Sequence, residues 1–270
     1  GKNSGAYFTF ETNKIDKINY RIAISFVAIE NAKENLKNEE KHLTFEEYQR
    51  ETSKEWDKYL SAIKIKSKNE DRIKQFYTHF YHSLIHPNIV SDVNGEYMGA
   101  DFKVHKTKEN REQYSSFSVW DTYRTQGQLI AMLFPKKSSD MMQSLVDFAE
   151  QAGGYGRWIL ANIETGIMQG DPTPILISNS YAFGGDDFDL ETAYSYMKKG
   201  ALIPRLYSQK QEIRPYLEEY INNGHTFASM SLEYTSADFA IAQFALNAVG
   251  NKEDYNYFKN RSQNWKNNYN

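Results

Sequence analysis

The chain has 270 residues, enough to bury a large core as one large or two medium domains. Its 32 Lys and Arg nearly balance its 35 Asp and Glu, so a formal net charge of −3 gives no reason to expect nucleic acid or an anionic membrane as a partner. The absence of cysteine excludes a disulfide framework, a thiolate metal site and a cysteine nucleophile, and no run of about 18 apolar residues suggests a membrane span.

Residues 6–29 have the alternation of β-strands. Large apolar residues fall at every second position over its second half, at Tyr20, Ile22, Ile24 and Phe26. The pattern predicts a hairpin whose neighbouring strands are missing from the chain. The chain also begins at Gly1 rather than Met and carries no signal peptide, so we expect it to be a piece of a longer protein.

From about Ile29 the periodicity becomes helical. Thr44 is the predicted N-cap of a helix, and Glu47 three residues later completes a capping box. Another helix is predicted over 69–86, ending before Pro87. Further helices are predicted at 119–134, 138–152, 189–202, 211–222, 231–249 and 252–268. Such a succession fits an (α/α)₆ toroid or an open helical bundle equally well.

Two segments interrupt the helices. Residues 92–98 contain Asn94-Gly95, the turn of a β-hairpin. Residues 153–189 hold seven of the 15 glycines together with Pro172 and Pro174, which predicts a long structured loop region. Such loops often carry function.

The segment Phe117-Ser118-Val119-Trp120-Asp121-Thr122-Tyr123-Arg124-Thr125 is the most informative part of the chain. It places an indole, a carboxylate and a guanidinium within a few residues, which suits a sugar with an apolar ring face and a belt of hydroxyls. We expect Asp121 and Arg124 to face a common concave site rather than solvent. The alternative is a buried Asp–Arg pair at a helix start with Trp120 in the core.

This segment, followed by Gly153-Gly154-Tyr155-Gly156-Arg157-Trp158 and by Glu164-Thr165-Gly166-Ile167-Met168-Gln169-Gly170-Asp171-Pro172, resembles glycoside hydrolase family 92. Members of that family are calcium-dependent exo-α-mannosidases that invert the anomeric centre. The resemblance also covers residues 22–36 and 76–88, Ser231-Leu232-Glu233-Tyr234 and Asp238, which is nearly the whole chain. Its motifs are fairly specific because several blocks occur in the same order.

The resemblance implies a mainly α fold, a partial (α/α)₆ toroid preceded by the end of a β-sandwich. Residues 1–29 would end that sandwich, 30–64 would be linker helices, and 65–270 would be the first half or more of the catalytic domain. It further implies a mannose-containing glycan as substrate, calcium as cofactor with ligands outside this chain, and a periplasmic or extracellular location in bacteria.

The resemblance also suggests a sugar-binding wall formed by Trp120, Asp121, Arg124, Trp158, Glu164 and Asp171. From the residues alone, a helix cap is favoured for Glu164 and a turn before Pro172 for Asp171. One departure concerns the same loop, because Tyr155-Gly156 stands where the family commonly has Leu-Pro. Loop geometry and substrate preference near Trp158 are therefore open.

An inverting glycosidase needs a general acid and a general base about 6.5–9.5 Å apart. The family carries this pair on later acidic motifs that are not found before Asn270, so the catalytic residues are expected beyond Asn270 and the chain alone is expected to be inactive. Two alternatives remain: an (α/α)₆ glycosidase of another sugar specificity, and a non-catalytic carbohydrate-binding module.

Possible metal ligands are sparse. His79, His82 and His86 share one predicted helix without a nearby carboxylate cluster, so packing at the helix end is favoured over a zinc site. The run from Gly184 to Asp189 has the oxygen ligands that calcium prefers, although Asp187 or Asp189 is better explained as a helix cap.

Overall fold

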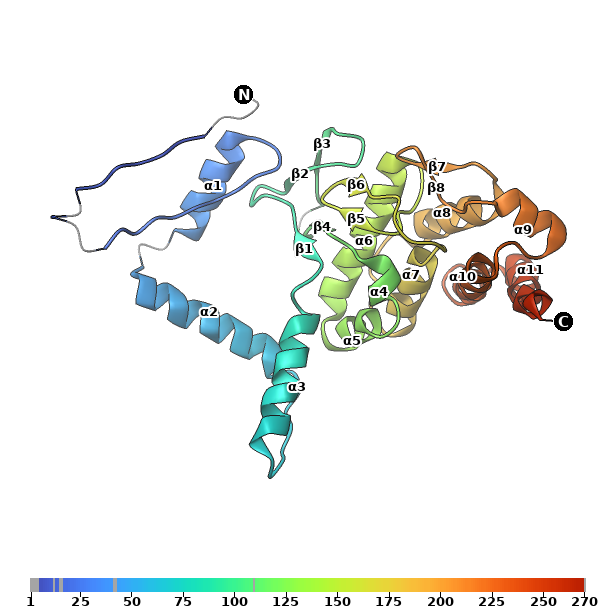
Figure 1. The fold of residues 1–270 in the computed structure, drawn as a ribbon, viewed down its shortest axis with the longest axis horizontal. Helices are drawn as coiled ribbons and strands as arrows, with labels where there is room; N and C mark the ends of the chain where they lie inside the picture. Colours follow the sequence, from blue (N-terminus) through green and yellow to red (C-terminus); the bar gives the residue numbers. More distant parts are fainter. Residues whose placement is uncertain (1–4, 12, 15–16, 41–42, 109, 270) are drawn as a thin grey trace.

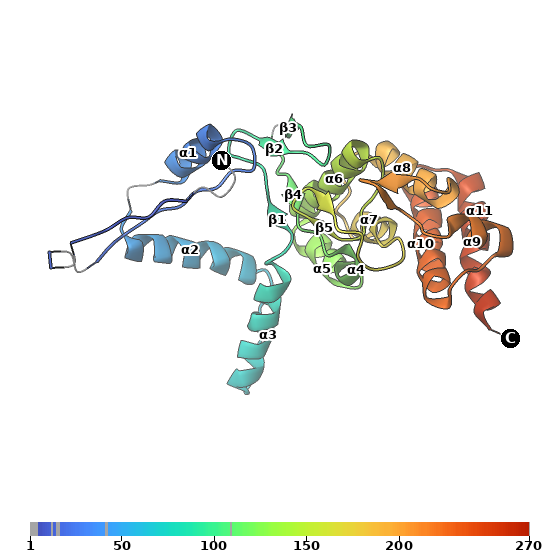
Figure 2. The same ribbon diagram turned by 45° about the horizontal axis from the view of Figure 1, so that its top comes forward.

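The computed structural model describes residues 5–11, 13–14, 17–40, 43–108 and 110–269, so residues 1–4 of the predicted β segment and Asn270 lie outside it. Three helices form an arm beside the main helical body (Figure 1). The arm contains α1 (Ile29–Glu39), α2 (Phe45–Leu60) and α3 (Glu70–Ser83), and the turned view in Figure 2 shows the same separation. The predicted linker helices are thus present as α1 and α2.

Local caps fix the starts of the arm helices. The Thr44 side chain accepts the Glu47 N–H and the Glu47 side chain accepts the Thr44 N–H, which confirms the predicted capping box. The Asn69 side chain accepts the N–H groups of Asp71 and Arg72 at the start of α3.

The predicted strands before α1 are not formed. The described residues between 5 and 28 run out and back as extended segments (Figure 1) but make no β-ladder. Their apolar side chains are open to solvent, with Tyr7 90% and Phe8 81% exposed. A strand needs a hydrogen-bonded neighbour and a covered apolar face, and two extended segments alone supply neither. The alternation was therefore correctly recognised, but it does not produce a sheet in this chain.

Asp92 attaches the arm to the body. Its carboxylate accepts hydrogen bonds from the Ser25 hydroxyl at 2.7 Å, the Asn31 amide at 2.8 Å and the Asn35 amide at 2.7 Å. Asp92 is 7% exposed, so these three donors satisfy a carboxylate that burial would otherwise leave without partners. The N-terminal segment and α1 are held against the turn before β2 in this way.

All strands in the described residues are short and form two-stranded antiparallel ladders. Gly95 sits in a tight turn with φ +85°. The hairpin predicted around this turn is wrong, because β2 (Glu96–Met98) follows the turn and pairs with the later strand β3 (Val104–Lys106). The other ladders join β1 (Asn88–Ile89) to β4 (Tyr114–Ser115), β5 (Ile159–Leu160) to β6 (Ile163–Glu164), and β7 (Tyr207–Ser208) to β8 (Gln211–Glu212).

The main body is helical and contains the largest hydrophobic core. Val119, Leu145, Ile177, Met197 and Phe258 are among its fully buried side chains and come from five different helices. The body helices are α4 (Val119–Thr122), α5 (Gln126–Leu133), α6 (Pro135–Ala152), α7 (Thr173–Ala182), α8 (Leu190–Leu202), α9 (Leu217–Asn223), α10 (Ala228–Asn247), α11 (Lys252–Arg261) and the 3₁₀ helix η1 (Ser262–Asn268).

Several predicted boundaries change. The helix predicted at 119–134 is broken into α4 and α5 at Thr125, whose backbone has φ −156° and is not helical. The Gln126 amide donates to the Ser83 and His86 carbonyls and ties the start of α5 to the end of α3. The helix predicted at 211–222 begins as β8 and only then becomes α9. The one predicted at 252–268 ends in the tighter turns of η1.

The helix α7 was not predicted, since its sequence lies within the glycine-rich stretch 153–189. It packs against α5, α6 and α10, and every residue from Thr173 to Ser178 is buried. A helix that is covered on nearly all sides has no polar face, so it lacks the periodicity by which an amphipathic helix is recognised. By contrast, the predicted cap at Asp189 is confirmed, because its carboxylate accepts the Thr192 N–H at 3.0 Å.

Candidate functional site

Three aromatic and charged residues of the Phe117–Thr125 motif meet at the junction of α4 and α5. The guanidinium carbon of Arg124 lies 5.1 Å from the centre of the Trp120 ring and 4.9 Å from that of Tyr123. Both rings attract the cation through their π faces, so they hold it in place without using its N–H donors. Arg124 makes no hydrogen bond or ion pair with any other described residue.

A carboxylate from a distant part of the chain joins them. Burial raises the pKa of the Glu233 carboxyl, while the Arg124 guanidinium and the Tyr123 hydroxyl act in the opposite direction without cancelling the effect. Glu233 comes from α10, and its Cβ lies so close to Gly170 that a methyl group added there would be 2.6 Å away. We call Trp120, Tyr123, Arg124 and Glu233 the Arg124 cluster.

The predicted site residues Asp121 and Arg124 are both exposed, and their facing a common concave site stays a prediction. The short helix α4 lies at the surface, and nothing in the described residues covers that side. Asp121 accepts a short hydrogen bond from the Ser118 hydroxyl one turn earlier. The part that either side chain plays in binding stays a prediction.

The Glu164 carboxylate is occupied by backbone donors. One of its oxygens accepts the N–H of Arg157 at 2.7 Å and that of Trp158 at 3.4 Å, and the other accepts the N–H of Gly166 at 2.9 Å. Burial raises the pKa of Glu164, and these donors lower it only in part. Glu164 therefore holds the loop that carries Trp158, whose own side chain is partly exposed.

The departure at Tyr155-Gly156 belongs to the same loop. A Cβ at position 156 would lie 2.3 Å from a carboxylate oxygen of Glu164 and 2.7 Å from Ile159 Cγ1. Since every other residue type carries a Cβ, only glycine leaves room for the Glu164 carboxylate in this arrangement. Tyr155 is 3% exposed and its hydroxyl donates to the Ala193 carbonyl at 3.1 Å, so it is a core residue.

Asp171 belongs to a buried charge network rather than to the Arg124 cluster. Its Oδ2 lies 2.8 Å from Arg214 Nε, and Arg214 Nη1 lies 2.7 Å from Asp238 Oδ1. Arg261 binds both Asp238 oxygens at 2.7 Å. We call Asp171, Arg214, Asp238 and Arg261 the buried charge network.

The two carboxylates of this network differ in their titration. Burial raises the pKa of both, but for Asp238 the guanidinium groups of Arg214 and Arg261 outweigh burial, and its pKa is lowered. Asp171 has Arg214 as its main partner and feels repulsion from Asp238, so its pKa stays raised. Asp171 thus fixes the loop next to Gly170, and a direct role in sugar binding stays a prediction.

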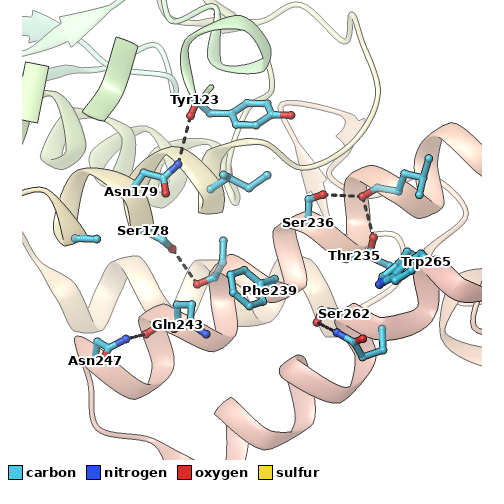
Figure 3. Close-up of a pocket in the computed structure, with 15 residues that line it drawn as sticks. Tyr123, Ser178, Asn179, Thr235, Ser236, Phe239, Gln243, Asn247, Ser262 and Trp265 are labelled. Carbon is cyan, nitrogen blue, oxygen red and sulfur yellow. Dashed lines mark hydrogen bonds between the residues drawn. The ribbon is translucent and has the colours of Figure 1, made fainter. Parts of the chain in front are cut away.

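A cavity of about 640 Å³ lies between α7, α10 and η1 (Figure 3). Tyr123, Phe239 and Trp265 line it together with amides and hydroxyls, a lining that would suit a sugar. Most of those polar groups are already used within the fold: Ser178 donates to the Ala240 carbonyl and Asn179 to that of Tyr123. None of the six predicted site residues lines this cavity.

The described residues contain no group of three or more His, Asp or Glu that could hold a metal ion. The acidic run before α8 is used otherwise, because Asp187 lies 3.1 Å from Arg111 and Asp189 caps the helix. In the same range no helix is long and apolar enough to cross a bilayer.

The predicted sequence motifs meet only in part. Trp120 and Arg124 come together as expected, whereas Glu164 and Asp171 are each occupied by other partners. The structure adds Tyr123 and Glu233, which were not predicted as site residues. The signal for Glu233 was its place in the Ser231–Tyr234 block that carries the resemblance, but nothing in the sequence indicates that this block meets Arg124.

The chain is mainly helical and gathers aromatic and guanidinium groups at the Arg124 cluster. A family model described as "Glycosyl hydrolase family 92 catalytic domain" matches residues 31–270, and the chain belongs to this family. No curated protein sequence shows a significant match to this chain.

Solved structures agree with this assignment. The chain is 27% identical, with a TM-score of 0.80, to the family GH92 α-mannosidase from Bacteroides thetaiotaomicron in complex with mannoimidazole, over 90% of this chain and 31% of that one. It matches the fold of a family GH92 inverting mannosidase from the same organism with a TM-score of 0.83 at 22% identity, over 91% and 34% of the two chains. The chain thus spans about a third of these structures, which confirms a mainly α fold that is part of an (α/α)₆ domain.

Proposed function

We propose that this chain is part of an exo-acting, inverting α-mannosidase that removes terminal mannose from glycans, and that it supplies part of the sugar-binding wall. The observation that carries the proposal is the Arg124 cluster, which lies in the motif Trp120–Arg124 within a chain of this family. A guanidinium without hydrogen-bond partners donates to sugar hydroxyls, and a neighbouring carboxylate accepts from them. Trp120 and Trp158 add apolar ring surface.

The general acid and base are proposed to lie outside the described residues. An inverting mechanism needs one carboxylic acid to protonate the leaving oxygen and a second carboxylate to activate water. Glu164 and Asp171 are engaged by backbone N–H groups and by Arg214, which leaves them poorly placed for proton transfer to a ligand. Calcium is likewise proposed as a cofactor with its ligands elsewhere, and the resemblance supports a periplasmic or extracellular location.

The test compares the 270-residue chain with the whole protein that contains it. We expect the whole protein to release mannose from α-mannosides with inversion, to lose this activity in a calcium chelator, and the 270-residue chain to release none. Mannose release by the chain alone would show that the acid and base lie within it. Turnover of a different glycoside would favour the other glycosidase, and sugar binding without turnover by the whole protein would favour the binding module.

A further inference from the structure

Glu233 stands out among the carboxylates of the described residues. Its Oε2 is the one carboxylate oxygen there that is shielded from solvent and has no hydrogen-bond partner. The buried acids around it are all paired: Glu164 with backbone N–H groups, Asp171 with Arg214, and Asp238 with two arginines. A shielded acceptor without a donor costs free energy, so a fold that keeps one calls for an explanation.

The position of Glu233 is fixed from two sides. Its Cβ and Cγ lie against Gly170, where a side chain would come within 2.6 and 3.0 Å of them. Gly170 has φ +89° and is followed by Asp171, which Arg214 anchors in the core. The Arg124 guanidinium and the Tyr123 hydroxyl are near enough to lower the pKa of this carboxyl, although no ion pair within 4 Å joins Glu233 to Arg124. The base of the Glu233 side chain is thus fixed against Gly170, while its carboxylate lies within the influence of the Arg124 charge.

A ligand that carries hydroxyl groups would satisfy both unmatched groups. The N–H donors of Arg124 are open to solvent and free to donate to a ligand, and the shielded oxygen of Glu233 lacks a donor; a pair of neighbouring sugar hydroxyls would serve both groups. The terminal torsion of a glutamate is broad, so the oxygen can turn toward such a ligand at little cost. A phosphate or carboxylate ligand would suit Arg124 but would be repelled by Glu233.

We infer that Glu233 is a ligand-binding carboxylate that accepts a hydrogen bond from a hydroxyl of the sugar held at Trp120 and Arg124. The inference rests on the proposed function and deepens it. It names the contact by which the site distinguishes a sugar that carries a particular hydroxyl from one that lacks it. It also explains the raised pKa of this carboxyl, since a group adapted to a ligand is left with too few partners when the ligand is away.

The experiment measures equilibrium binding of methyl α-mannoside to the 270-residue chain by calorimetry or nuclear magnetic resonance. Glu233→Gln keeps the shape of the side chain and removes its charge, and Glu219→Gln is the matched control on an exposed face of α9. We expect Glu233→Gln to weaken binding about tenfold, because a neutral amide oxygen accepts a hydroxyl less strongly than a carboxylate does. Glu219→Gln should bind as the wild-type chain does, and all three chains should melt at similar temperatures.

Deoxy sugars make the test specific to a hydroxyl. Removing from the ligand the hydroxyl that donates to Glu233 should weaken binding to the wild-type chain more than binding to Glu233→Gln, as a double-mutant cycle requires for two groups in contact. Additive losses for every deoxy sugar would overturn the inference. So would equal binding by Glu233→Gln and the wild type, or a lowered melting temperature with unchanged affinity of the folded protein.

The outcome separates the inference from the proposed function. If the wild-type chain binds a sugar other than mannose, and Glu233→Gln loses that binding, the mannosidase proposal fails and the role of Glu233 stands. If the wild-type chain binds mannoside and Glu233→Gln binds it equally well, the role of Glu233 fails and the mannosidase proposal stands. If the wild-type chain binds no sugar at all, the inference is refuted.

Discussion

The buried charge network and the Arg124 cluster both join arginine to carboxylate, but they do so in opposite ways. In the network, Asp238 is 0% exposed and receives three charged N–H groups from Arg214 and Arg261. In the cluster, Arg124 is exposed and held by rings, and a shielded oxygen of Glu233 has no partner. The Asp238 carboxylate is saturated, although Arg214 Nη2 in the same network has no partner, and the fold depends on such a carboxylate. A carboxylate oxygen that lacks a donor beside aromatic rings is instead available to a ligand.

The largest loss of stability is expected from removing the Asp238 carboxylate of the buried charge network. Asp238→Ala leaves Arg214 and Arg261 buried without their shared counter-ion, which typically destabilises a protein by about 3–5 kcal/mol. Chemical denaturation of the variant against the wild type measures this loss. Asp186→Ala, at an exposed position before α8, is the control and should change stability little. An Asp238→Ala chain as stable as the wild type would mean that the network does not support the fold.

The same network predicts how stability depends on pH. The folded pKa of Asp238 is lowered, so its contribution is fully present above the unfolded value of about 3.9 and is lost as pH falls through the folded value. The stability difference between the wild type and Asp238→Asn should therefore be constant near neutral pH and should shrink in the acid range below that unfolded value. A difference that persists unchanged to the lowest pH at which the chain is folded would contradict this assignment.

These two regions also show how far the sequence alone leads. Local signals predicted well: the capping box at Thr44 and Glu47 and the cap at Asp189 depend on residues three apart. Pairings across the fold were missed, because Asp171 meets Arg214 and Glu233 meets Arg124 only after the helices pack. For that reason Asp171 was predicted as a ligand residue and Glu233 was not. The helix α7 was missed because burial on all sides leaves no polar face to recognise.

The loop that carries Trp158 is expected to show an intermediate loss of stability, and a substitution of Gly156 tests how tightly this loop is packed. Gly156→Ala would place a Cβ against Glu164 and Ile159, and relieving that overlap is expected to cost about 1–3 kcal/mol in stability. Gly5→Ala serves as the control because no atom lies within 4 Å of the added group. If Gly156→Ala melts as the wild type does, the Glu164 carboxylate is not held as tightly as its three backbone donors indicate.

The smallest change in stability is expected from a substitution of Glu233. Whether that change is a gain or a loss distinguishes a ligand-binding carboxylate from a structural one. The folded pKa of Glu233 is raised, so its protonated form is favoured: its contribution to stability is present below the unfolded pKa of about 4.3 and is lost as pH rises through the folded value. Glu233→Gln removes a charge that the fold disfavours near neutral pH. We therefore expect its melting temperature at pH 7 to equal or exceed that of the wild type by about 2 °C or less, with the difference vanishing at pH 4. Calorimetric melting at both values measures this, and a clear loss of stability at pH 7 would place Glu233 with the structural carboxylates of the buried charge network instead.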